Sequence, residues 1–172
     1  MTYSIVFSSR TGNTEQLARA IRSVLPAGDC LYFGGPDAAA LAADRLYIGF
    51  WTEKGSCDEA MAAFLAGVQN KEVFLFGTAG FGSQPAYFQA VLKRVQANLG
   101  ANNTLVGSFM CQGRMPQAVR RRYETMLAAP DHAPNLEAMI ENFDRALFCK
   151  LCLFKLNFKL SNCNIKWRSV FL

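Results

Sequence analysis

The stretch TYSIVFSSRTGNTEQLARAIRSVL, residues 2–25, decides the fold of this chain. Residues 2–8 form a short run of aliphatic and aromatic side chains, which suits a buried strand. Apolar residues then recur at helical spacing from Leu17 to Leu25, which predicts a helix over residues 14–25. A strand is therefore expected to run through a short polar loop directly into a helix.

The same alternation continues to residue 147. We predict further strands at residues 29–33, 45–51, 72–76 and 104–111, and helices at 56–68, 85–99, 116–127 and 136–147. Strands separated by helices of about a dozen residues indicate βαβ units with right-handed crossovers. The expected fold class is α/β, with a doubly wound, five-stranded parallel sheet between two layers of helices.

In such sheets ligands bind beyond the carboxyl ends of the strands, so the loop after the first strand comes first. It combines three hydroxyls, an amide and a glycine with the free backbone N–H groups of a helix start, where the helix dipole is positive. This donor set suits the dianion of a phosphate monoester. A plain helix cap by Asn13 or Thr14 is the alternative, but a cap needs only one such residue. The expected phosphate-binding residues are Ser9, Arg10, Thr11, Gly12, Asn13 and Thr14.

This loop resembles the phosphate-binding loop of the flavodoxins, a family of FMN-binding three-layer sandwiches. The resemblance covers residues 1–148 and implies FMN as the cofactor. It further implies that the loops after the third and fourth strands hold the flavin ring between Trp51 and Phe81. The peptide between Lys54 and Gly55 is the candidate to turn its carbonyl toward flavin N5, with a plain turn glycine as the alternative. The residues expected around the ring are Phe50, Trp51, Thr52, Gly55, Thr78, Ala79, Gly80, Phe81 and Gly82.

The resemblance also implies a function. We expect an FMN-binding electron carrier that passes electrons to a partner redox enzyme, with no catalytic side chain and no metal. One alternative is a self-standing FMN-dependent reductase of a quinone or tetrapyrrole-like substrate, and a second is a flavodoxin-fold binding module without FMN. Arg114, after the fifth strand, is a candidate to meet the flavin edge or a partner carboxylate, or it is a solvated rim arginine.

The net charge of +5 is unevenly distributed. Residues 149–172 hold five of the 18 Lys and Arg and none of the 13 Asp and Glu, so residues 1–148 are neutral. A neutral body gives no indication of nucleic-acid binding. Residues 149–172 are predicted to be a basic, Cys-, Phe- and Lys-rich extension of unknown role, for which membrane contact is not the favoured interpretation. With no secretory leader recognised, we expect a cytoplasmic protein with reduced cysteines.

Overall fold

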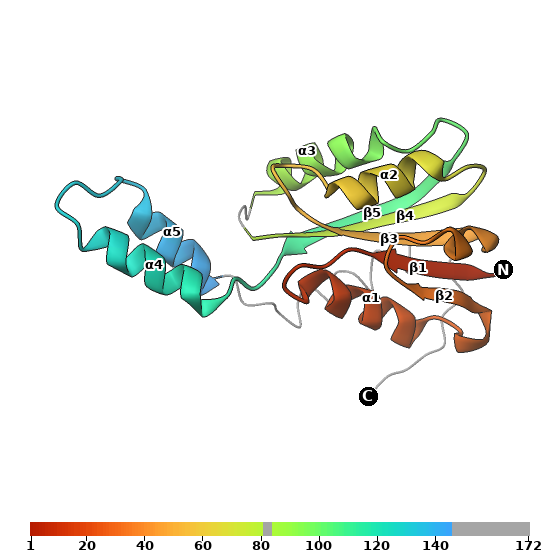
Figure 1. Ribbon diagram of the computed structural model, residues 1–172, viewed down its shortest axis with the longest axis horizontal. Helices are drawn as coiled ribbons and strands as arrows, with labels where there is room; N and C mark the ends of the chain where they lie inside the picture. Colours follow the sequence, from red (N-terminus) through yellow and green to blue (C-terminus); the bar gives the residue numbers. More distant parts are fainter. Residues whose placement is uncertain (81–83, 146–172) are drawn as a thin grey trace.

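The computed structural model describes residues 1–80 and 84–145, without the side chains of residues 142 and 145. Over these residues the chain forms five parallel strands in the order β2-β1-β3-β4-β5, as Figure 1 shows. The predicted α/β class and five-stranded parallel sheet are therefore confirmed. The strands are β1 (Tyr3–Phe7), β2 (Cys30–Gly34), β3 (Arg45–Trp51), β4 (Glu72–Ala79) and β5 (Thr104–Gln112). The helices are α1 (Asn13–Val24), α2 (Glu59–Gly67), α3 (Pro85–Gln96), α4 (Gln117–Leu127) and α5 (Leu136–Arg145), and short 3-10 turns occupy Ala27–Asp29 and Ala38–Ala42.

Helices cover both faces of the sheet. On one face α1 packs against β1, β3 and β4, and buries Leu17 and Ile21 with Phe74 and Phe76 of the sheet. On the other face α2 and α3 lie over the sheet and share a second core that contains Met61, with the 3-10 turn Ala38–Ala42 at its edge. Burying these side chains stabilises the fold by about 1.5–3 kcal/mol for each large apolar residue.

The helices α4 and α5 lie differently from α1, α2 and α3. They pack against each other and extend beyond the carboxyl ends of the strands (Figure 1). Tyr123 and Phe143 are buried, and Arg120 donates from Nε to Asp144 across the pair at 2.8 Å. The sequence predicted both helices but not this placement, because the pairing of α4 with α5 is a contact between elements that neither helix's own pattern specifies.

Two element boundaries differ from the prediction in ways that shape the carboxyl edge. The strand β4 continues to Ala79, so Thr78 lies within the sheet and not in the following loop. The helix α2 begins at Glu59, since Asp58 caps it by accepting a hydrogen bond from the Met61 N–H at 3.1 Å. No helix among the described residues is long and apolar enough to cross a bilayer. The extension at residues 149–172 lies outside the described residues.

Candidate functional site

The start of α1 presents backbone donors at the carboxyl end of β1. Gly12 precedes the helix with φ of 82°, a left-handed conformation that favours glycine. The Glu15 N–H donates to Ser9 Oγ at 3.3 Å, whereas the N–H groups of Asn13 and Thr14 have no hydrogen-bond partner among the residues described. These two donors point out of the positive end of the helix, so this donor set fits a phosphate dianion.

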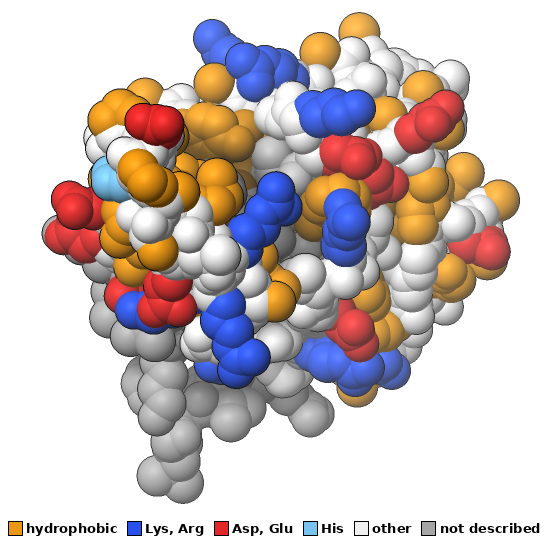
Figure 2. Space-filling view, turned by 60° about the vertical axis from the view of Figure 1, so that its left-hand side comes forward, with side chains coloured by type: hydrophobic (Ala, Val, Ile, Leu, Met, Phe, Trp, Pro, Cys, Tyr) orange, Lys and Arg blue, Asp and Glu red, His pale blue; other side chains and the backbone are white. Residues whose placement is uncertain are grey.

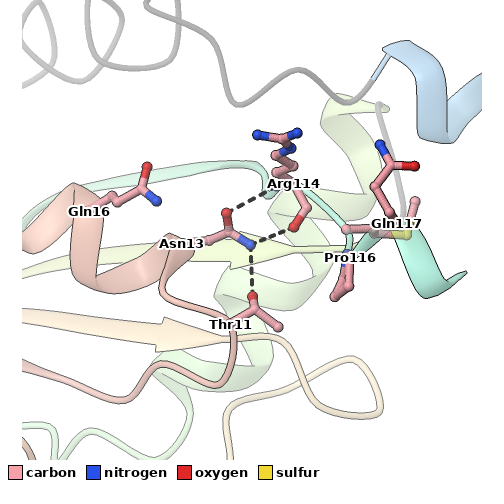
Figure 3. Close-up of a pocket in the computed structure, with 7 residues that line it drawn as sticks. Thr11, Asn13, Gln16, Arg114, Pro116 and Gln117 are labelled. Carbon is pink, nitrogen blue, oxygen red and sulfur yellow. Dashed lines mark hydrogen bonds between the residues drawn. The ribbon is translucent and has the colours of Figure 1, made fainter.

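The Asn13 side chain ties this loop to the loop after β5 (Figure 3). Its Nδ2 donates to the Arg114 carbonyl at 2.9 Å, and its Oδ1 accepts from the Arg114 N–H at 3.1 Å. The same Nδ2 donates to Thr11 Oγ1 at 2.8 Å. A Cβ on Gly113 would lie 2.8 Å from Nδ2, so glycine at this position leaves room for the amide. Asn13 is thus a bridge between loops 101 residues apart in the sequence.

Thr78 connects two further segments of the site. Its hydroxyl lies 2.9 Å from that of Thr14, and both threonines are buried. Its carbonyl accepts from the Thr52 N–H at 2.8 Å and from the Thr52 hydroxyl at 3.0 Å. The side chain of Thr14 therefore fastens α1 to β4, and its backbone N–H remains as a donor at the start of α1.

Two adjoining cavities lie at this edge of the sheet, and they share Thr11, Asn13, Arg114, Met115 and Pro116. The smaller has a volume of about 240 Å³ and is also lined by Arg10, Trp51, Thr52, Thr78, Ala79, Gly80 and Gly113. The larger has a volume of about 550 Å³ and is also lined by Gln16 and Gln117. Figure 2, in which this side of the molecule comes forward, shows Lys and Arg side chains in the middle of the face.

Trp51 lies at the end of β3, half-buried, where the smaller cavity opens. The guanidinium carbon of Arg10 lies 5.4 Å from the centre of the Trp51 ring, which is the geometry of a cation–π contact. Such a contact is worth about 0.5–1 kcal/mol at an exposed site. Arg10 therefore belongs to the aromatic wall of the cavity, although the sequence placed it in the phosphate loop.

The segment after Trp51 makes a tight turn. Glu53 and Ser56 exchange two backbone hydrogen bonds of 2.8 Å each, and Lys54 and Gly55 between them have φ of 47° and 82°. Both central residues are left-handed, as in a two-residue type I′ turn. The Gly55 carbonyl accepts a hydrogen bond of 3.1 Å from Arg94 Nη1, which fastens the turn to α3.

The structure brings most of the predicted site residues together. Eight of them line the smaller cavity: Arg10, Thr11, Asn13, Trp51, Thr52, Thr78, Ala79 and Gly80. Ser9, Gly12, Thr14 and Gly55 shape the same loops without lining it. Phe50 was expected at the ring, but its side chain is fully buried in the core, where its Cζ lies 2.6 Å from the place of a Cβ on Gly77. Phe81 and Gly82 lie outside the described residues.

The sequence missed the contribution of the loop after β5. Gly113, Met115, Pro116 and Gln117 all line the cavities, and Gln16 faces them from α1. In parallel sheets ligands bind at the carboxyl ends of the strands, and this rule indicates the loop after β5 as much as the other loops at that edge. The sequence singles out only Arg114, because the loop lacks a motif of its own.

The sheet order and the loops at its carboxyl edge define an α/β protein of the flavodoxin-like class. The family model described as "Flavodoxin domain" matches residues 4–148. The chain belongs to the flavodoxin family, whose cofactor is FMN.

The chain is also similar to individual proteins. The chain is 42% identical over 164 residues to the flavodoxin-like domain-containing protein BilS of Clostridium symbiosum (strain WAL-14163), covering 86% of each chain. It is 24% identical over 149 residues to the protein of the same name from Clostridioides difficile (strain CD3), covering 83% of each. A solved structure, two-electron reduced Megasphaera elsdenii flavodoxin, matches with a TM-score of 0.46 and 20% identity, over 84% of this chain and 100% of that one.

Proposed function

We propose that this protein is an electron carrier that holds FMN at the carboxyl edge of its sheet and passes electrons to a partner redox enzyme. The observation that carries the proposal is the chemistry of the cavity walls. Among the described residues that line the two cavities, Arg10 and Arg114 are the only ones with ionisable side chains. An arginine does not give up its proton near neutral pH, so these walls offer no general acid or base. A site that positions a redox group without proton-transferring side chains fits electron transfer better than substrate chemistry.

The residues present suggest how FMN is held. The N–H groups of Asn13 and Thr14, with the hydroxyls of Ser9 and Thr11, form the donor set for the phosphate. Trp51 supplies an aromatic face for the ring, and it lies on the cavity that also contacts Thr11. Bound FMN supplies the electron-accepting and electron-donating chemistry, and the chain fixes its position and surroundings.

A flavin-binding experiment tests the phosphate role. In Thr11→Ala the affinity for FMN should fall about tenfold or more, because a hydrogen bond to a charged group contributes about 1.5–3 kcal/mol. The affinity for riboflavin, which lacks the phosphate, should stay unchanged. Thr125→Ala, which removes an exposed threonine of α4, is the matched control. Equal losses for both flavins would remove the basis for a phosphate cradle at this loop.

A second measurement separates the carrier from a reductase. Reduced, FMN-loaded protein should deliver its electrons once to a small neutral quinone, in proportion to its flavin content. With NADH or NADPH as the electron source and excess quinone, a carrier should show no sustained turnover. Sustained turnover would favour the self-standing FMN-dependent reductase instead.

A further inference from the structure

The larger cavity contains a guanidinium that no carboxylate in the described part of the chain neutralises. Arg114 is exposed, and none of the ion pairs among the described residues involves its side chain. The four ion pairs are formed by Arg19, Arg45 and Arg120. Arg114 therefore keeps its donors available to a molecule that enters the cavity.

The backbone of Arg114 is fixed even though its side chain is exposed. The two hydrogen bonds to the Asn13 amide, at 2.9 and 3.1 Å, hold its carbonyl and its N–H. The preceding Gly113 is buried against the same amide, and the following Met115 is 7% exposed. Because the backbone is already fixed, binding at Arg114 does not require ordering of the loop, and only the side chain loses conformational entropy.

The surroundings of Arg114 suit an anion with an apolar body. Figure 3 shows its guanidinium between Gln16 and Gln117, on the far side of Asn13 from the Thr11 hydroxyl. The two glutamine amides add hydrogen-bond donors, while Met115 and Pro116 add an apolar wall. No Asp or Glu lines this cavity among the described residues. Guanidinium and amide donors against an apolar wall match a carboxylate carried on a hydrocarbon or aromatic frame.

We propose that the larger cavity is a subsite for a carboxylate of the redox partner that exchanges electrons with the flavin. The inference rests on the proposed function, since the adjoining smaller cavity is the one assigned to FMN. The two cavities share five lining residues, Arg114 among them, which places such a carboxylate next to the flavin. The 5′-phosphate of FMN is the other candidate source of the anion, because Thr11 and Asn13 line the larger cavity together with Arg114.

The test uses a redox-inert pair of probes that differ only in charge. 2-Naphthoate and 2-naphthamide are titrated into oxidised, FMN-loaded protein and, in parallel, into apo-protein, with binding followed by calorimetry. The wild type should bind the naphthoate about tenfold more tightly, the ratio expected for one charge-assisted hydrogen bond. Arg114→Gln should lose this preference. Arg121→Gln, an exposed arginine on α4, should keep it.

Parallel affinities for FMN and riboflavin decide the source of the anion. The proposal expects Arg114→Gln to leave both flavin affinities unchanged. A tenfold loss for FMN alone would overturn it and assign Arg114 to the flavin phosphate. Equal binding of naphthoate and naphthamide by the wild type would also overturn it. Failure of the wild type to bind any flavin would refute the proposed function, whereas the naphthoate preference of the apo-protein would still test the anion site separately.

Discussion

Adding one methyl group at Gly113 should destabilise the wild type and be nearly neutral in an Asn13→Ala background. In the wild type the new Cβ would lie 2.8 Å from Nδ2 and 2.9 Å from Cγ of Asn13, so the amide must move. Gly113 does not have a positive φ, so alanine imposes no backbone strain of its own. We expect Gly113→Ala to lower the free energy of unfolding by about 1–2 kcal/mol, the usual effect of overpacking a close contact.

In the Asn13→Ala background the two closest atoms are removed, and only the Cβ of residue 13 remains near the new methyl group, at 3.2 Å. Asn13→Ala alone should cost about 2 kcal/mol, since three hydrogen bonds at 2.8, 2.9 and 3.1 Å are lost. Adding Gly113→Ala should then be close to neutral, because the gain of about 0.4–1 kcal/mol from restricting the unfolded chain offsets the one tight contact that remains. The coupling between the two sites is therefore about 1–2 kcal/mol, outside the error of a double-mutant cycle.

Urea unfolding of the four proteins measures this cycle, with thermal unfolding as a second readout. Each kcal/mol should shift the midpoint temperature by about 2–4 °C in a chain of this size. Additive effects of the two substitutions would show that the Asn13 amide does not lie against Gly113, and would refute the bridge between the two loops. The m-values of the variants should match, so that the differences report on stability alone.

Two further predictions concern buried and charged groups outside this bridge. Thr14→Val should lower the free energy of unfolding by about 1–3 kcal/mol, because it leaves the buried Thr78 hydroxyl without its 2.9 Å partner. Adding Thr78→Val should restore much of this loss. A double variant that is no more stable than Thr14→Val would contradict this prediction. Hydrogen bonds from the Thr2 N–H and hydroxyl lower the pKa of Asp44 below its usual value. The contribution of the Asp44 carboxylate to the stability of the fold should therefore be complete above about pH 4. It should disappear as the pH falls through the lowered pKa. Asp44→Asn should flatten that part of the stability profile, and an unchanged acid limb would argue against the assignment.

Much of the site could be predicted because local sequence determined it. The run of hydroxyls, amide and glycine at residues 9–14 sits where a strand meets a helix, and both elements follow from short-range periodicity. Trp51 could be placed because it ends a β-branched and aromatic run. Asp58 was an available signal for the start of α2, since its side chain caps the helix at Met61, but the prediction began the helix at residue 56.

The remaining features depend on contacts between distant residues. The hydrogen bonds between Asn13 and Arg114 join residues 101 positions apart, and the one between Arg94 and Gly55 joins residues 39 positions apart. No local sequence pattern predicts contacts over such separations. The position of the Phe50 side chain could not be predicted either, because an aromatic residue next to Trp51 in the sequence suits the flavin ring and the protein core equally well. Its side chain packs over Gly77 and joins the core between the sheet and the helices α2 and α3.

The most direct test of the central claim is the flavin content of the purified protein. Protein isolated with its native ligand should show the visible absorption of a flavin, and the released cofactor should be FMN at one per chain. The apo-protein should take up added FMN and recover the same spectrum. A colourless protein that does not bind added FMN would contradict the account.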